Sequence, residues 1–212
     1  MKTLIAIPCM DMVHTLFMTS ILGLKHPPGI EFGVISSSLV YDARNRLATK
    51  AIDEGFDRVF WIDSDMYFEP ETMEKLEADM DTGLDFVCGI YFTRKAPVLP
   101  CVYSALEVRK KSGIDTPTAT AYKNYPKDSL FEVAGAGFAG VMTSTKLLRD
   151  VADAGKFPFS PMLGWGEDFS FCLRARALGY KLWCDSRIKI GHIGQSIVDE
   201  AAWEAQKNER SE

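Results

Sequence analysis

Two aspartates separated by one residue directly follow an apolar stretch at 60–62, in the order Asp63-Ser64-Asp65. Residues i and i+2 of an extended segment point to the same side, so the two carboxylates converge on one place. Two ionised carboxylates in a partly desolvated place repel each other unless protons or a cation intervene. Oxygen ligands suit Mg²⁺ or Mn²⁺. Taken alone, the pair is compatible with a divalent metal site and with a turn that caps the next helix, and the residues leave both interpretations open.

A second group of chemistry-bearing residues lies nearer the C-terminus. Glu167 and Asp168 open a helical pattern, and His192 follows a later apolar stretch. The helix macrodipole stabilises negative charge at a helix N-terminus and keeps a carboxylate there ionised. A capped amphipathic helix and a packed histidine are the plainer interpretations, and the residues alone leave both open.

The residues around Asp63 and Asp65 are expected to form alternating strands and helices, which would position the two carboxylates. The pattern predicts strands at 3–7, 30–35, 58–62 and 86–92, with helices at 11–24, 39–54 and 70–80 between them. This β-α-β order indicates a mostly parallel sheet that helices cover on both faces. Ligands of open α/β sheets bind beyond the carboxyl ends of the strands, which is where Asp63 and Asp65 fall.

The second half of the chain has a different pattern. Residues 94–127 contain several prolines and a polar stretch, which predicts strands joined by long surface loops, a frequent place for substrate-specific elements. The elements expected after it are strands at 131–134 and 137–143, a helix at 146–154, a loop at 158–166, a helix at 167–178, short strands at 182–184 and 188–190, and a polar helix or tail at 200–212.

Composition excludes several classes of protein. The 212 residues are 47% hydrophobic and 25% charged, which is typical of one globular domain. With 24 basic and 29 acidic residues, the net charge of −5 argues against adhesion to polyanions through bulk charge. No stretch approaches the roughly 18 apolar residues of a membrane-spanning helix. The five scattered cysteines have no CxxC pair and predict reduced thiols in a cytoplasmic protein.

Taken together, the order of these motifs resembles a known family. A strand ending in Pro8-Cys9, the Ala43-Arg44-Asn45 step, Trp61 to Asp65, Gly166-Glu167-Asp168 and Gly191-His192 occur in the order found in GT-A glycosyltransferases. The similarity is closest to glycosyltransferase family 2 and its small phage-type members, and it extends from residue 5 to about 194. It implies a Rossmann-like α/β fold, with a mostly parallel central sheet flanked by helices and a small antiparallel element on the acceptor side.

The resemblance also implies an activity. A metal-dependent enzyme would move a hexose-like sugar from a nucleotide diphosphate sugar, with a UDP-sugar as the leading donor, to a hydroxyl acceptor. Inversion at the anomeric carbon is slightly favoured over retention. A single domain over 1–212 would comprise a nucleotide-binding half at about 1–92, an acceptor-binding half at about 93–195 and a polar tail at 196–212. One divalent cation, Mn²⁺ or Mg²⁺, would be the cofactor.

The resemblance assigns donor-binding roles to residues that match the motifs. The residues expected to border the nucleotide sugar are Pro8, Cys9, Arg44, Asn45, Asp63, Ser64, Asp65 and Trp165. Pro8 would lie near the base, and Arg44 and Asn45 match the family's Ala-Arg-Asn step. An ordinary helix-surface arginine and a cap are the alternative for that step. Trp165 could stack on a sugar or acceptor ring, or simply pack.

The metal and the base follow from the same comparison. Asp65 would ligate a metal that bridges the two phosphates, Asp63 would contact the ribose or a water on the metal, and His192 matches a frequent third ligand. Asp168 matches the acid that serves as general base in inverting members, with Glu167 beside it.

The acceptor stays open at this point. A surface glycan, a lipid-linked sugar, a protein and a hydroxymethylated phage DNA base are all compatible with a small transferase. The negative net charge argues mildly against DNA. The run Arg109-Lys110-Lys111 could contact a phosphate locally, but a solvated turn is the favoured interpretation of that run.

Three other classes share part of the pattern. An aspartyl-phosphate-type phosphatase would need Thr or Val at the position of Tyr67 and would carry its aspartates after the first strand, not the third. A nucleotidyltransferase usually has a glycine-rich basic loop after the first strand, which residues 8–12 lack. A non-catalytic nucleotide-sugar binding module would not need Asp63, Asp65, Asp168 and His192 to be intact.

Overall fold

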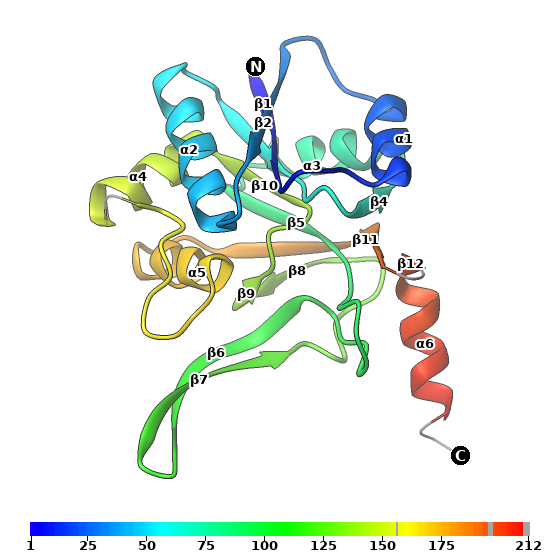
Figure 1. Cartoon of the computed structure of the whole chain (residues 1–212), viewed down its shortest axis with the longest axis vertical. Coiled ribbons are helices and arrows are strands. Elements are labelled where there is room, and N and C mark those ends of the chain that lie inside the picture. The colour runs from blue at the N-terminus through cyan, green and yellow to red at the C-terminus, as the bar shows by residue number, and fades with distance from the viewer. Residues whose placement is uncertain (156, 195–196, 210–212) are drawn as a thin grey trace.

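A mostly parallel sheet forms the centre of the computed structural model, which describes residues 1–155, 157–194 and 197–209 (Figure 1). Its main strands, in spatial order, are β12 (Ile197–Val198), β11 (Leu182–Ile193), β5 (Phe86–Ile90), β10 (Val141–Ser144), β3 (Arg58–Trp61), β1 (Thr3–Cys9) and β2 (Ile30–Ser36). Strand β1 pairs in parallel with β2 and β3, and β5 pairs in parallel with β11. Strand β10 runs antiparallel between β3 and β5. The short strands β4 (Met66–Phe68) and β8 (Leu130–Val133) pair with β11.

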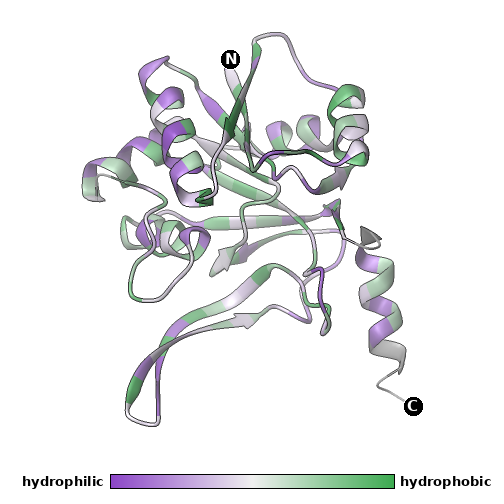
Figure 2. Ribbon diagram, viewed as in Figure 1, coloured by the Kyte–Doolittle hydropathy of each residue, from purple (hydrophilic) through white to green (hydrophobic). Residues whose placement is uncertain are grey.

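Helices cover both faces of this sheet, as the alternating pattern predicted. Along β1, Leu4 and Ala6 belong to one apolar cluster, and Ile5 and Ile7 belong to another. Helices α2 (Val40–Asp53), α4 (Thr145–Gly155) and α5 (Glu167–Ala177) pack on the first face, while α1 (Thr15–Gly23) and α3 (Thr72–Met80) pack on the second. A sheet buried on both faces needs apolar residues at successive positions. Accordingly, hydrophobic colour follows the central strands in Figure 2, whereas the helices carry both colours.

A smaller antiparallel sheet projects from the second half of the chain. It consists of a long hairpin, β6 (Val102–Lys111) and β7 (Ile114–Ala121), with β9 (Gly135–Ala136) on the other side of β6 (Figure 1). The expected antiparallel element is therefore present, and the expected strands lie within 94–127, but the polar stretch at 109–113 continues the hairpin through a two-residue turn where a long loop was expected. Pro117 is tolerated because β7 is an edge strand, where a missing N–H breaks no ladder hydrogen bond.

Two further element predictions need correction. Residues 182–193 form the single strand β11 because a bulge between Asp185 and Lys189 lets the chain stay extended where two short strands were expected. In the stretch 137–143, strand pairing begins only at Val141. At the end of the described chain, α6 (Glu200–Glu209) is a helix, and the last predicted residues, 210–212, lie outside the described part.

Two expectations drawn from the composition concern membrane-spanning helices and the cysteines. Within the described ranges, no helix is both long and apolar enough to cross a membrane. All five cysteines lie in the described part of the chain and are free thiols, and all but Cys9 are buried. Their burial is in keeping with small apolar side chains in a packed core.

Candidate functional site

A cleft of about 380 Å³ lies at the carboxyl ends of β1, β2 and β3. Its walls include Pro8, Cys9, Asp63, Ser64, Asp65 and Arg94, together with Met10, Met12 and residues that lead into α2. Parallel strands end at the same edge of a sheet. Pro8 and Cys9 at the end of β1 therefore lie close to the Asp63–Asp65 segment after β3, as the sequence predicted. The volume falls in the usual range for small-molecule sites, about 300–1,000 Å³.

Arg44 lies behind this cleft and connects three elements. It is buried on α2, with 2% of its surface exposed. Its Nη2 donates to Asp63 Oδ1 at 2.8 Å, its Nη1 donates to the Phe138 carbonyl at 3.3 Å, and its Nε lies 3.5 Å from Glu167 Oε1. Burial raises the pKa of Asp63, although the guanidinium charge of Arg44 opposes that effect. Arg44 therefore supports the two acids from within and does not line the cleft, where the family comparison had placed it against the nucleotide.

Asp65 and His192 bring their ligand atoms together. Asp65 Oδ2 lies 3.4 Å from His192 Nε2 and 2.8 Å from Nη1 of Arg94. His192 Nδ1 lies 2.9 Å from the Phe92 carbonyl. Because a carbonyl can only accept, Nδ1 carries the proton and a neutral ring leaves its Nε2 lone pair directed at Asp65. Burial acts to raise the pKa of Asp65, but the charge of Arg94 and, whenever the His192 ring is protonated at both nitrogens, the hydrogen bond and charge of that ring outweigh it and lower that pKa.

These two side chains are the ones that fit a metal ion. Across the described residues, no three His, Cys, Asp or Glu side chains gather into a ready metal cluster. Asp63 lies in the same cleft, but one of its oxygens is already hydrogen-bonded to Arg44. An ion held by Asp65 and His192 would take its other ligands from a bound phosphate or from water. That mixture of oxygen and imidazole ligands suits Mn²⁺.

Asp168 is the second residue of α5 and carries a shifted pKa. Its Oδ1 accepts a hydrogen bond from the Phe169 N–H at 2.7 Å. Burial and the neighbouring Glu167 carboxylate raise the pKa of Asp168 to about 6. A carboxylate with that pKa is ionised at neutral pH and still basic enough to accept a proton from a reacting hydroxyl.

Tyr91 is a neighbour of Asp168 that sequence patterning missed. A Cβ built on Gly137 would lie 1.9 Å from Tyr91 Oη and 3.7 Å from Asp168 Oδ2, so the hydroxyl and the carboxylate both face this glycine. Burial raises the pKa of Tyr91 well above its usual value, and the hydroxyl therefore stays protonated. Tyr91 directly follows the buried strand β5 and has the pattern of a core residue, so the sequence contained no signal for it.

Asn45 and Trp165 lie apart from the cleft walls. Asn45 Oδ1 accepts from the Phe159 N–H at 2.9 Å and thereby anchors the loop before α5. Trp165 is 5% exposed, and its ring packs edge-on against Phe169 at a centroid distance of 5.6 Å. The burial of Trp165 favours the packing interpretation over a platform for a sugar ring.

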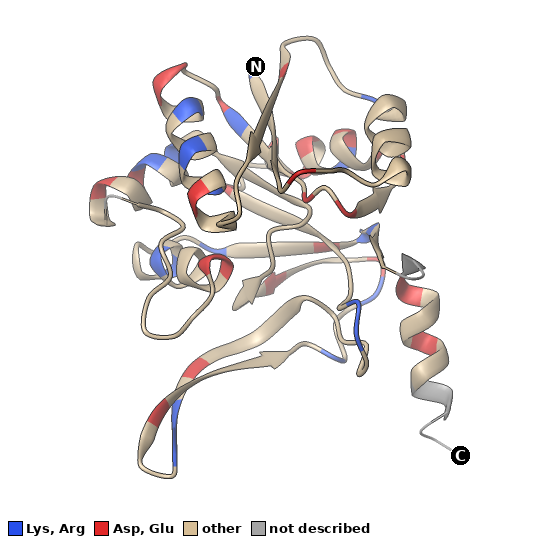
Figure 3. Ribbon diagram, viewed as in Figure 1, with Lys and Arg blue, Asp and Glu red and all other residues tan. Residues whose placement is uncertain are grey.

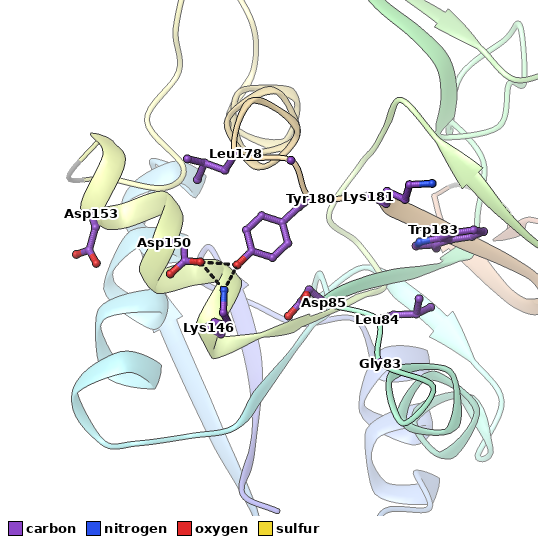
Figure 4. Close-up of a pocket in the computed structure, with 11 residues that line it drawn as sticks. Gly83, Leu84, Asp85, Lys146, Asp150, Asp153, Leu178, Tyr180, Lys181 and Trp183 are labelled. Carbon is purple, nitrogen blue, oxygen red and sulfur yellow. Dashed lines mark hydrogen bonds and ion pairs between the residues drawn. The ribbon is translucent and has the colours of Figure 1, made fainter.

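A second hollow, of about 720 Å³, is larger but lies away from this chemistry (Figure 4). Its walls come from the amino-terminal ends of β5 and β11 and from α4, at the edge of the sheet opposite to Asp63 and Asp65. Lys146 Nζ donates to Asp150 Oδ2 at 2.6 Å and to Tyr180 Oη, so these polar groups satisfy one another. The smaller cleft therefore remains the candidate site.

Comparison with known proteins rests on structure, since no family model and no curated protein matches the sequence. A197 from STIV superposes with a TM-score of 0.66 at 21% identity, over 92% of this chain and 86% of that one. GalNAc-T7, solved with UDP, GalNAc and Mn²⁺, gives 0.62 at 10% identity over 91% of this chain. A fragment of S. aureus TarS gives 0.52 at 14% identity over 88% of this chain.

The fold is that of the GT-A glycosyltransferases. This α/β architecture, with its mostly parallel sheet and small antiparallel sheet, confirms the predicted fold class. The chain spans 44% of the GalNAc-T7 chain and 60% of the TarS fragment, so it corresponds to only part of those GT-A proteins.

Proposed function

We propose that this protein transfers a sugar from a nucleotide diphosphate donor to a hydroxyl acceptor. The observation that carries the proposal is that Asp65, whose carboxylate lines the cleft, faces the Nε2 lone pair of His192. That pair suits a divalent cation on a diphosphate. The GT-A fold supports the same activity, and GalNAc-T7, which shares it, was solved with UDP, GalNAc and Mn²⁺.

Donor binding would use the residues along the cleft. Pro8, Cys9 and Ser64 would border the nucleotide, and Asp63, fixed by Arg44, would present its second oxygen to a ribose hydroxyl. Asp65 and His192 would hold Mn²⁺ or Mg²⁺. The ion, when bound, supplies positive charge that stabilises the departing diphosphate. We propose a UDP-sugar as donor because the GT-A neighbour GalNAc-T7 was solved with UDP.

Asp168 would act as the general base. It would accept the proton of the acceptor hydroxyl while that oxygen bonds to the anomeric carbon and the bond from that carbon to the diphosphate breaks. Glu167 beside it raises the pKa of Asp168 and binds Arg44, which places it in a supporting role. A single displacement of this kind inverts the anomeric configuration, and we therefore propose inversion.

A donor panel tests the proposed function. The enzyme is incubated with UDP-, GDP- and dTDP-hexoses and Mn²⁺, and release of the nucleoside diphosphate is measured with and without a chelator. We expect chelator-sensitive release from at least one donor. The proposal is wrong if calorimetry detects no nucleotide binding and no donor is hydrolysed, or if p-nitrophenyl phosphate is turned over in place of every nucleotide sugar.

A further inference from the structure

A groove of about 670 Å³ lies between the β6–β7 hairpin and the segment at 93–99, outside the nucleotide cleft. Its polar wall is made chiefly of hydroxyl and amide groups. These come from Thr93, Ser104, Thr120, Tyr122 and Asn124. Such groups donate and accept hydrogen bonds without carrying charge.

One part of the groove lies next to the proposed reaction centre. Tyr103 lines the groove and packs edge-on against Phe169, at a centroid distance of 4.7 Å, and Phe169 directly follows Asp168. Thr93 also lines it and directly precedes Arg94, which pairs with Asp65. The groove is therefore connected to the proposed base through Tyr103 and Phe169, and to the proposed metal ligand Asp65 through Thr93 and Arg94.

The hairpin is irregular at this point. Tyr103 pairs with Ala121 and Ala105 pairs with Thr120, so Ser104 is an extra residue in β6. A bulge bends a strand, re-aims side chains, and is over-represented beside active sites. Here it exposes Ser104 in the groove, and its hydroxyl donates to the Thr120 carbonyl at 3.3 Å.

The charges nearby do not suit a polyanion. Among the described residues that line the groove, Lys123 is the charged one. Toward the hairpin tip, Arg109 Nη2 pairs with Glu107 at 2.8 Å and Lys110 Nζ lies 3.8 Å from Asp115, so the basic run is largely balanced by acids. Figure 3 shows both signs of charge along the hairpin. A nucleic-acid strand needs a row of cations that follows its phosphates.

We propose that this groove binds the acceptor and that the acceptor is an uncharged oligosaccharide, an inference that rests on the proposed function. Hydroxyl and amide side chains would hydrogen-bond its hydroxyls, and the ring of Tyr103 or Tyr122 would offer an apolar surface to a sugar ring. The hydroxyl to be glycosylated would lie at the Tyr103 end, beside Asp168.

Binding and transfer test the proposal separately. Neutral trisaccharides of glucose, galactose and N-acetylglucosamine are tested by saturation-transfer NMR against the enzyme without donor. A duplex DNA containing hydroxymethylcytosine is tested in parallel. We expect at least one neutral trisaccharide to bind, with less than a twofold change in affinity between 50 and 300 mM salt, because an uncharged ligand releases few counterions.

Variants then locate the ligand. Thr120→Trp fills the groove from an exposed position and should weaken trisaccharide binding, or raise the acceptor KM, by at least about tenfold. Val108→Trp places the same side chain on an exposed position of the same hairpin outside the groove and should change neither. Lys123→Glu should have less than a twofold effect.

The outcomes separate this proposal from the proposed function. Nucleotide release without acceptor reports on the donor site alone, and all three variants should retain it. The acceptor proposal is overturned if no neutral trisaccharide binds, if Thr120→Trp binds as well as Val108→Trp, or if only the DNA binds and Lys123→Glu abolishes that binding.

Discussion

One hydrogen bond decides which nitrogen of His192 is available to a metal. The Phe92 carbonyl accepts from Nδ1, so a neutral ring presents Nε2 toward Asp65. Hydrogen bonds of this kind fix the tautomer and orientation of a ligating histidine and are worth roughly 10–100-fold in metal affinity. The backbone of residue 92 is therefore part of the candidate site, although its side chain packs in the core.

Removing Asp65 tests the metal assignment. Asp65→Ala takes away the carboxylate that faces Nε2 of His192, and Mn²⁺-dependent binding of UDP should weaken by at least about tenfold. Calorimetric titration with UDP, in the presence and absence of Mn²⁺, measures the change. Asp115→Ala, an exposed aspartate on the hairpin, is the matched control. Unchanged Mn²⁺–UDP affinity in Asp65→Ala would show that the metal lies elsewhere.

Asp168 gives the proposed reaction its expected pH dependence. Burial and Glu167 raise the pKa of Asp168 to about 6, so the ionised base is lost as the pH falls through that value and activity should rise from pH 5 to pH 7. Asp168→Asn should keep donor binding and lower transfer by about 10²–10⁴-fold. Rates of transfer from pH 5 to 8 measure both effects. Full turnover by Asp168→Asn would exclude it as the base.

At the level of single residues, sequence motifs picked out the acidic side chains of the candidate site but not the residues that contact them. Asp63, Asp65 and Asp168 follow strand or helix boundaries, whose positions depend on local pattern. The pairing of Arg44 with Asp63 joins residues 19 positions apart, and the contact of His192 with Phe92 joins residues 100 apart. Tertiary packing alone determines such contacts, so a sequence pattern could not predict them.

At the scale of elements, helix α6 holds the segment that carries Arg94. Gln206 Oε1 accepts from the Val98 N–H at 2.8 Å, and its Nε2 donates to the Val98 carbonyl at 3.0 Å. The Trp203 ring stacks on Phe92 at a centroid distance of 6.0 Å. A helix at the far end of the chain thus fixes both Phe92, which orients His192, and the segment that follows it.

Shortening Gln206 should loosen that segment. Gln206→Ala removes two hydrogen bonds at a cost of about 1–3 kcal/mol in stability, and we expect the donor KM to rise several-fold with a smaller change in kcat. Steady-state kinetics and thermal unfolding measure the two effects. Ala205→Ser, at an exposed position of the same helix, is the control. A donor KM equal to that of the wild type would show that α6 does not position the segment.

The helices and strands predicted well were those whose signals lie within their own stretch of sequence. Helices α2, α3 and α5 and strands β1, β2 and β3 were predicted close to their observed bounds because their periodicity and end signals are local. Strands were expected in the region of the β6–β7 hairpin, but long loops were expected to join them because of its polar residues and Pro117, whose fit to an exposed edge strand follows only from the sheet. The antiparallel direction of β10 likewise follows from its neighbours and not from its own residues.

For the molecule as a whole, a buried acid pair links stability to pH. Asp79 on α3 and Asp185 on β11 are 7% and 2% exposed, and Arg187 contacts both, with Nη2 3.4 Å from Asp79 and Nε 2.8 Å from Asp185. Burial first, and then the Asp185 carboxylate, raise the pKa of Asp79 to about 6. An unfolded aspartate has a pKa of about 3.9.

This shift predicts a loss of stability as the pH rises. Between about pH 4 and pH 6 the folded protein binds more protons at Asp79 than the unfolded chain does. The stabilisation that protonated Asp79 gives the folded state is therefore complete below about pH 4 and is lost above about pH 6. Asp79→Asn, which cannot ionise, should raise the free energy of unfolding at pH 8 by on the order of 1 kcal/mol, or about 2–4 °C in Tm. Thermal unfolding of both proteins at pH 5 and pH 8 measures the difference, which should be smaller at pH 5. A variant less stable than the wild type at pH 8 would contradict the prediction.

The position of β10 has a consequence for how the protein can be made. Residues 141–144 lie between β3 and β5, both of which come from the first half of the chain. During synthesis, the edges of β3 and β5 that face each other therefore have no partner strand until residues 141–144 have been made and have left the ribosome. Unpaired edges of apolar strands invite pairing with other chains. Nascent chains that stop before this strand should need chaperones, and the proposed nucleotide-binding half should not be separable from the half that follows it.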